Sequence, residues 1–189
     1  MAYPTQSHAQ IQPELGAGER VLWSGQPRQG LVLRGADALL IPFSFLWGGF
    51  AFFWEGTMLQ SGAPLFFALW GIPFVLAGLY MIVGRFFVEA KQRARTWYGL
   101  TNERIIIVSG LFERKVESLN LRTLTDLSLS ETKNGEGNIS FGCRSLFGSM
   151  FSGFAGWPGM KAYLGPRFDM IPNVKIVYET IRTTQRAAA

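Results

Sequence analysis

The sequence predicts a membrane protein of the α+β class: a two-helix transmembrane hairpin, then a small antiparallel β-barrel or sandwich capped by a C-terminal amphipathic helix. Of the 189 residues, 48% are hydrophobic and only 16% are charged, which leaves too few charges to cover so much apolar surface. Residues 35–84 contain no lysine or arginine. Short alternating segments with turn signals then follow, and an apolar stripe of helical period ends the sequence.

Two apolar blocks without charges define the hairpin, Ala38–Trp54 and Pro64–Gly84. About 20 apolar residues are needed to cross a hydrocarbon core of about 30 Å. We therefore expect spans at about 35–54 and 64–84, with a turn at Glu55–Ala63. A buried soluble helix can be equally apolar, but two successive blocks without a polar face are hard to bury in 189 residues.

The charges around the hairpin predict its orientation. Lysine and arginine lie on both flanks and none lies in the turn, and such cations stay on the cytoplasmic side during insertion. Both termini are therefore expected in the cytoplasm. Asp37 is expected to cap the first helix. The glycines of the two blocks would let helix backbones approach, either within the hairpin or toward a partner helix; they are Gly48, Gly49, Gly71 and Gly78.

The rest of the sequence predicts three further regions: a flexible tail at 1–13, an N-terminal cytoplasmic segment at 14–34, and a cytoplasmic domain at 86–186. The hairpin itself occupies 35–85. Strands of the domain are expected at 96–100, 104–109, 112–121, 124–132 and 138–142. Asn134-Gly135 between two alternating segments is a strong signal for a β-hairpin turn.

The C-terminal segment has an apolar residue at every third or fourth position, which indicates an amphipathic helix. Pro172 suits its first turn. The apolar stripe consists of Ile171, Val174, Val177, Tyr178 and Ile181. We expect this stripe to close the open end of the barrel.

The segment 97–121, WYGLTNERIIIVSGLFERKVESLNL, resembles the signature of the bacterial PH-domain family of membrane-anchored proteins. The likeness continues through the Asn-Gly turn into the strand ISFG and a proline-marked helix, and GERVLWSGQP at 18–27 resembles the segment before the hairpin. It implies a PH-like fold of about seven strands closed by a helix, tethered to a bacterial inner membrane. The family is not known as a catalytic one.

An apolar segment between the last predicted strand and the helix has no charge from Ser145 to Met160. Phenylalanine and tryptophan are favoured at a membrane interface, so we expect this segment to dip into the membrane or to grip an apolar partner. The alternative is a lid packed over the barrel. The residues expected to make contact are Leu146, Phe147, Phe151, Phe154 and Trp157.

A set of cations is the candidate site for lipid headgroups or a protein partner: Lys91, Arg93, Arg95, Arg104, Arg114 and Lys115. Each juxtamembrane cation gains about 1 kcal/mol from an anionic leaflet. In the alternative interpretation the first three only fix topology, and Arg114 and Lys115 pair with Glu113 and Glu117. General contact with anionic lipid is expected in either case.

Several other functions are not expected. The sequence has a single histidine, His8, and a single cysteine, Cys143, so no catalytic residue, cofactor site or metal site is nominated. The sequence pI of about 9.7 suits a nucleic-acid-binding protein. The net charge of +5 is spread along the chain, however, and orientation in the membrane requires the same cations, so no nucleic-acid partner is expected.

The sequence thus predicts a non-enzymatic membrane protein whose cytoplasmic domain is an adaptor surface for lipid headgroups, a protein partner or a second copy of the chain. The alternative function is an accessory or assembly subunit of a larger membrane complex. A lipid-modifying enzyme is a third class, for which the sequence offers no candidate residues.

Overall fold

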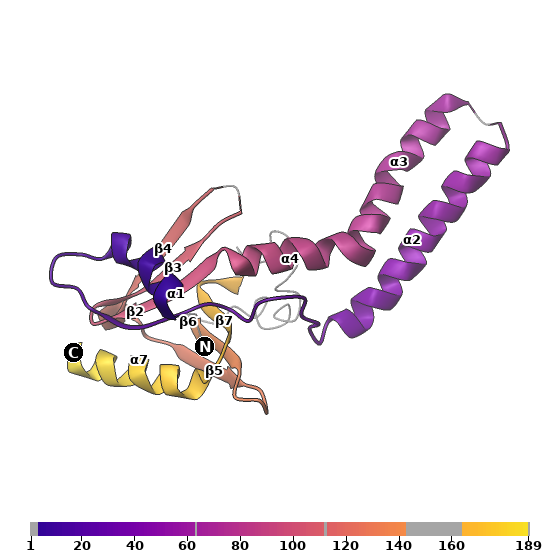
Figure 1. The fold of residues 1–189 in the computed structure, drawn as a ribbon. Coiled ribbons are helices and arrows are strands. Elements are labelled where there is room, and N and C mark those ends of the chain that lie inside the picture. Colours follow the sequence, from indigo (N-terminus) through magenta and orange to yellow (C-terminus); the bar gives the residue numbers. More distant parts are fainter. Residues whose placement is uncertain (1–3, 63, 112, 143–163, 189) are drawn as a thin grey trace.

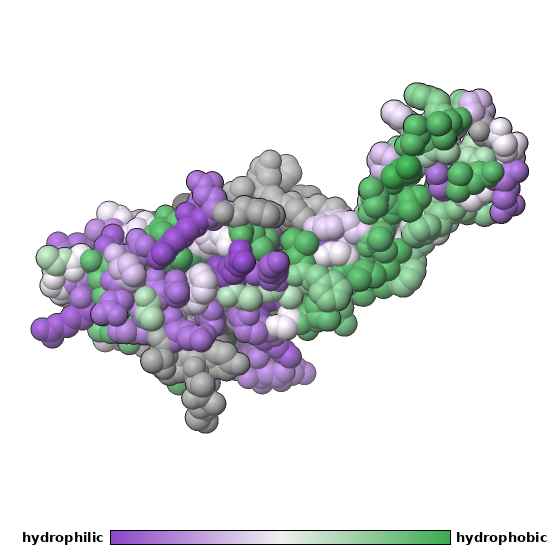
Figure 2. All heavy atoms as spheres, turned by 45° about the horizontal axis from the view of Figure 1, so that its top comes forward, coloured by the Kyte–Doolittle hydropathy of each residue, from purple (hydrophilic) through white to green (hydrophobic). Residues whose placement is uncertain are grey.

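The computed structural model describes residues 4–62, 64–111, 113–142 and 164–188, and these form an α+β architecture with two long apolar helices and two antiparallel sheets (Figure 1). The predicted α+β class is confirmed. Figure 1 shows the apolar helices standing away from the β domain as a hairpin. Figure 2 shows the same contrast on the surface, since the hairpin is largely hydrophobic and the β domain largely hydrophilic.

The hairpin pairs α2, Asp37–Gln60, with α3, Leu65–Leu79. A π-helical segment, Tyr80–Gly84, joins α3 to α4, Arg85–Ala94, and α4 bends away from α3 at this segment (Figure 1). Such π-helical insertions are a common cause of helix bends. Both α2 and the helical stretch Leu65–Ala94 are long and apolar enough to cross a membrane.

The turn of the hairpin is shorter than the expected Glu55–Ala63, because α2 continues to Gln60. Glu55 is therefore a helical residue. The last turns of α2 contain only one glycine, and the Thr57 hydroxyl donates a hydrogen bond to the Phe53 carbonyl at 2.9 Å. The helix ends where Gly62 takes a positive φ of 66°, a conformation that glycine adopts without strain.

Close approach of α2 and α3 depends on glycine, as expected. A Cβ atom built on Gly78 would lie 2.9 Å from the Gly48 Cα atom, and one built on Gly71 would overlap the Glu55 carboxylate. Gly49 faces open space instead. Three of the four glycines therefore lie between the two helices of the hairpin.

Seven strands of the described residues form the two sheets. The first has the order β1-β2-β3-β4, with β1 at Val21–Gly25, β2 at Thr96–Thr101, β3 at Arg104–Ser109 and β4 at Lys115–Asn120. The second has the order β5-β6-β7, with β5 at Leu127–Glu131, β6 at Gly137–Phe141 and β7 at Arg167–Ile171. The turn predicted at Asn134-Gly135 joins β5 to β6. Strands β1 and β7 were not predicted.

The main core lies between the sheets and the C-terminal helix α7, Val174–Ala188. Phe168 of β7 is fully buried at its centre, with ring centroids 4.7 Å from Tyr98, 4.9 Å from Phe141 and 5.4 Å from Trp23. The predicted stripe of α7 covers this core. Ile171, however, ends β7, and Pro172 lies in the turn before the helix rather than in its first turn.

Helix α1, Pro4–Ile11, packs on the outer face of the first sheet, where a flexible tail was expected for residues 1–13. Ile11 is fully buried against Ile106 and Val108 of β3. The run Ile105–Val108 is apolar on both faces of the strand, and such a strand requires cover on both sides. The main core covers one face and α1 the other.

Candidate functional site: a buried ionic junction beside an exposed cationic rim

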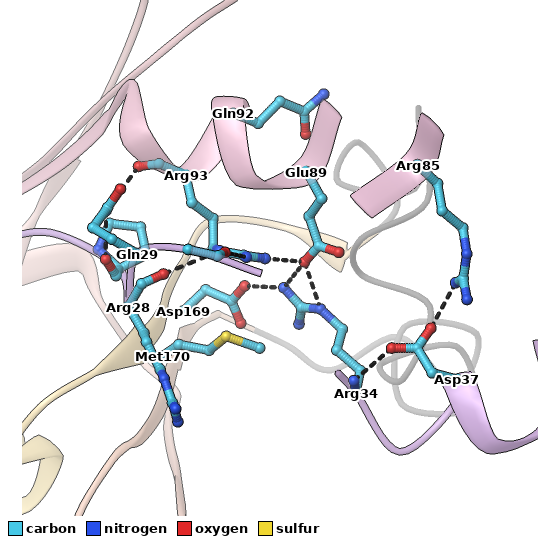
Figure 3. A network of polar contacts seen from close by, with 12 residues as sticks. Arg28, Gln29, Arg34, Asp37, Arg85, Glu89, Gln92, Arg93, Asp169 and Met170 are labelled. Carbon is cyan, nitrogen blue, oxygen red and sulfur yellow. Dashed lines mark hydrogen bonds and ion pairs between the residues drawn. The ribbon is translucent and has the colours of Figure 1, made fainter. Parts of the chain in front are cut away.

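Three segments meet where the hairpin joins the β domain: α4, strand β7, and the connector 26–36 that links β1 to α2 (Figure 3). Helix α4 contributes Arg85, Glu89 and Arg93, which are spaced by one helical turn and therefore lie on one face. All three are buried. We call this group of charges, with their partners on the other two segments, the ionic junction.

Arg34 of the connector bridges α4 and β7. Its Nη2 atom lies 2.7 Å from Glu89 Oε1 and 2.8 Å from Asp169 Oδ2, and its Nε atom donates to Glu89 Oε1 at 2.8 Å (Figure 3). The side chains of the three residues are each about 10% exposed or less. Burial lowers the pKa of Arg34, but the neighbouring Asp169 and Glu89 carboxylates outweigh this effect and hold the pKa above its usual value. Arg34 is therefore fully protonated at physiological pH.

Arg93 ties the connector to α4. Its guanidinium pairs with Glu89 and donates to the backbone carbonyls of Arg28, at 3.0 Å, and Gly30. The Gln29 side chain donates in return to the Arg93 carbonyl at 3.3 Å. Burial lowers the pKa of Arg93, and the Glu89 carboxylate opposes that shift. Because these contacts reach backbone atoms, they fix the path of the connector along the helix.

A separate ion pair closes the base of the hairpin. Arg85 Nη1 lies 2.6 Å from Asp37 Oδ1, and the Arg34 backbone N–H donates to Asp37 Oδ2 at 2.6 Å. Asp37 was expected to cap α2. The N-cap residue is instead Ala36, which makes no side-chain cap hydrogen bond. The Asp37 carboxylate accepts a hydrogen bond from Arg85 of α4. This pair joins the first residue of α2 to the first residue of α4.

The junction is continuous with the core of the β domain. The Asp169 backbone N–H donates to the Tyr98 hydroxyl at 3.1 Å, and Arg167 lies 3.3 Å from Asp169 Oδ1. Burial raises the pKa of Tyr98, so its hydroxyl stays neutral. The junction connects the hairpin firmly to the β domain, because its charged side chains pair with one another and are buried from solvent.

A cavity of about 680 Å³ adjoins the junction, between β4 and the segment that leads into β7. Its wall combines the ring of Tyr98 with the charged side chains of Lys115, Glu117, Arg167 and Asp169. Among the described residues, no group of three or more histidine, cysteine or acidic residues could hold a metal ion.

The structure separates the six predicted cations. Arg93 belongs to the buried junction. Arg104, the first residue of β3, pairs at 2.9 Å with Glu19, which precedes β1. Arg114 pairs with Glu14, not with Glu113, and Lys115 pairs with Glu117 as the alternative interpretation expected. Within the described part of the chain, no carboxylate pairs with the exposed residues Lys91 and Arg95.

Three of the cations are exposed near the β3–β4 turn and the end of α4, and we call them the cationic rim: Lys91, Arg95 and Arg114. Lys115 lines the cavity of about 680 Å³ beside Glu117 instead. Lys91 precedes Arg95, the C-cap residue of α4, by about one helical turn. Arg95 Nη1 donates to the Leu111 carbonyl in the β3–β4 turn, and both Arg95 and Arg114 line one small hollow beside that turn. The rim thus lies beside the end of α4 that enters the β domain. The expected contact residues of the apolar segment, Leu146 to Trp157, lie outside the described residues.

Arg104 has a structural partner that the sequence did not reveal. Its Nε and Nη2 atoms donate to the two Glu19 oxygens, each at 2.9 Å, and Thr101 donates to Glu19 Oε1 at 2.6 Å. These hydrogen bonds, foremost that from Arg104, lower the pKa of Glu19 to about 2. The pair fastens the segment before β1 to the β2–β3 turn.

Sequence reasoning missed most of the ionic junction. The spacing of Arg85, Glu89 and Arg93 was available as a one-turn repeat of alternating charge. Nothing in the sequence indicated that Arg34 and Asp169 would join it. Comparisons with family models, curated proteins and solved structures found no match to this chain.

Proposed function

We propose that this protein is a non-enzymatic membrane-anchored scaffold. In this proposal α2 and α3 cross the inner membrane of a bacterium, and a PH-like β domain on the cytoplasmic side offers a binding surface to lipid headgroups or a protein partner. The observation that carries the proposal is the outward surface of the hairpin. Leu46 and Phe53 of α2 are each 74% exposed and Leu65 of α3 is 73% exposed, and water does not favour such a surface.

Two further features support the arrangement. Helices α1 and α7 both lie on the β domain (Figure 1), so a hairpin that crosses the membrane places both on one side. That side is cytoplasmic if the flanking cations obey the positive-inside rule. The PH-like assignment draws support from the four-stranded and three-stranded sheets and from the C-terminal helix that packs on their shared core.

The ionic junction suits a scaffold because it fixes the orientation of the domain relative to the hairpin. A flexible linker would leave the β domain free to tumble beneath the membrane. Here Arg34 contacts both α4 and β7, and Arg93 holds the connector along α4. The cationic rim is therefore presented in one orientation.

The test is to purify the full chain from bacterial membranes in mild detergent and to quantify the lipids and proteins that remain bound. The paired substitution Arg95→Ala and Arg114→Ala is compared with Lys175→Ala, an exposed lysine on α7. We expect bound anionic lipid or a stoichiometric protein, lost in the paired variant and kept in the control. The same bound molecules in wild type and paired variant would contradict a binding role of the rim.

A second candidate function is an accessory subunit of a larger membrane complex. Gly49 and Gly56 of α2 face open space in the structure, and exposed small residues let a partner helix approach closely. The same purification decides between the candidates. A stoichiometric membrane protein lost on Gly49→Leu, with the rim variant unchanged, would favour the accessory subunit.

A further inference from the structure

We propose that α4 is an interfacial helix whose outward stripe rests on the cytoplasmic surface of the bilayer and binds anionic phospholipid headgroups. The stripe consists of Phe87 and Lys91 of α4, with Val83 in the π-helical segment before the helix and Arg95 at its C-cap, and all four are exposed. The inference rests on the proposed function, because it takes the hairpin as membrane-spanning. It adds a second attachment, by which the β domain is held against the membrane.

Helix α4 differs from an ordinary surface helix in burying a charged face and exposing an aromatic ring. A helix on a soluble domain buries its apolar face and exposes its charges. In α4 the charged face, Arg85, Glu89 and Arg93, is buried in the ionic junction, while Phe87 on the outward face is 60% exposed. An exposed aromatic ring flanked by cations is typical of a helix that lies in a membrane interface.

The outward stripe continues the exposed surface of the hairpin. Ile72, Leu76 and Leu79 of α3 are 45%, 59% and 52% exposed, and Val83 and Phe87, at 44% and 60%, are the next exposed large apolar residues along the chain. Phe87 comes two residues after Arg85 at the hairpin base, an advance of about 3 Å along the helix. The headgroup layer is about 5–8 Å thick on each side of the hydrocarbon core. Phe87 is thus still within this layer when the hairpin spans the bilayer.

The charges on the stripe indicate the chemistry of the lipid. After Phe87 the outward positions are Lys91 and Arg95, and neither is paired with a carboxylate of the described residues. Arg95 donates through Nη1 to the Leu111 carbonyl, so Lys91 is the main candidate for a lipid phosphate. Long cationic side chains beside an interfacial ring reach lipid phosphates while their methylene groups stay on the apolar surface. An anionic headgroup is therefore favoured over a zwitterionic one.

The test uses the full chain with Cys143→Ser, reconstituted into vesicles of equal parts phosphatidylcholine and phosphatidylglycerol. Single cysteines at Phe87→Cys, Leu69→Cys and Ile176→Cys carry an environment-sensitive fluorophore, and all three positions are exposed in the structure. Nitroxide lipids labelled in the headgroup or in the acyl chain quench the fluorophore according to its depth. Leu69 lies on α3 and reports on the hairpin, whereas Ile176 lies on α7 and is the aqueous control.

We expect the headgroup nitroxide to quench position 87, the chain nitroxide to quench position 69, and neither to quench position 176. If position 87 behaves like position 176 while position 69 is quenched, the interfacial helix is wrong and the spanning hairpin stands. If position 69 also escapes quenching, the proposed membrane anchor itself is wrong.

Selectivity for anionic lipid is tested at Lys91. The charge reversal Lys91→Glu is expected to lower the enrichment of nitroxide phosphatidylglycerol around position 87 about fivefold or more. The matched control Lys175→Glu reverses an exposed lysine on α7 and should change nothing. Equal enrichment in Lys91→Glu and wild type would overturn the assignment of an anionic headgroup.

Discussion

Arg34 is the residue that joins the helical part of the molecule to the β domain. Its guanidinium contacts Glu89 on α4 and Asp169 on β7, within 2.8 Å of each. Removing one member of a buried charge network leaves its partners uncompensated, which costs more free energy than the intact pair contributes. The buried arginine should therefore be far more sensitive to substitution than an arginine in a surface pair.

We predict that Arg34→Leu destabilises the β domain by about 3–5 kcal/mol. The matched control is Arg28→Ala, which removes an exposed pair with Glu136 at 3.0 Å and should cost about 1 kcal/mol or less. Thermal unfolding in detergent, followed by near-ultraviolet circular dichroism, measures both. Equal losses in the two variants would show that the junction does not hold the domain.

We predict that the stability of the fold depends on pH through Glu19. Its pKa in the folded protein is about 2, below the ordinary value of 4.5, chiefly because Arg104 donates to its carboxylate. The ionised form thus stabilises the fold fully above pH 4.5, and this contribution is lost as the pH falls toward 2. Glu19→Gln should lose about 1–3 kcal/mol at pH 7.

The difference in unfolding temperature between Glu19→Gln and wild type should shrink as the pH falls below 4.5. Glu117→Gln is the matched control, because its ion pair with Lys115 is open to solvent, with the two side chains 35% and 69% exposed. A constant difference between Glu19→Gln and wild type from pH 7 to pH 3 would contradict the assigned pKa.

At the level of elements, the hairpin is held by close contact of two helix backbones at Gly48 and Gly78. A Cβ on Gly78 would lie 2.9 Å from the Gly48 Cα. The Gly48 Cα is a backbone atom, so it cannot move aside as a flexible side chain could. Helix packing in lipid depends on such close contact because hydrocarbon offers no hydrophobic driving force between helices.

We predict that Gly78→Leu forces α2 and α3 apart and lowers the unfolding temperature in detergent by several degrees. Gly49→Leu is the matched control, since Gly49 lies on the same helix as Gly48 and faces open space. It should leave the unfolding temperature unchanged. A similar decrease in both variants would contradict this prediction, because it would show that the unfolding temperature does not depend on the contact between α2 and α3 at Gly78.

Elements with a strong local pattern could be predicted from the sequence. The apolar blocks of α2 and α3, the turn at Asn134-Gly135 and the stripe of α7 are all continuous in sequence. Strand β7 was missed because it has five residues, two of them charged, and Met170 has a positive φ of 50°. Helix α1 was missed because eight mostly polar residues predict no helix alone.

The site was less predictable than the fold. Composition identified six cations. Arg93 and Arg104 differ from the exposed rim in their burial and in their hydrogen-bond partners. The burial and the partners depend on residues that are far away in the sequence. Glu89 and Asp169 lie 55 and 135 positions after Arg34 in the sequence. Only the folded chain brings them together, and no periodicity in the sequence records that contact.

At the scale of the whole molecule, an apolar hairpin and a polar β domain are joined by buried charges. Figure 2 shows the boundary between the two surfaces near the base of the hairpin. If the hairpin spans the membrane, that boundary lies at the membrane surface, and the junction keeps the domain from separating from it. The turn of the hairpin and the β domain must then be accessible from opposite sides of the membrane.

The most direct test of this account is a topology measurement in intact bacterial spheroplasts that express the full chain with Cys143→Ser. Cysteines at Ser61→Cys, in the hairpin turn, and Ile176→Cys, on α7, are labelled with a membrane-impermeant maleimide; both positions are exposed. If the hairpin spans the membrane, position 61 is labelled in intact spheroplasts and position 176 only after permeabilisation. Labelling of both positions from the same side would contradict a membrane-spanning hairpin.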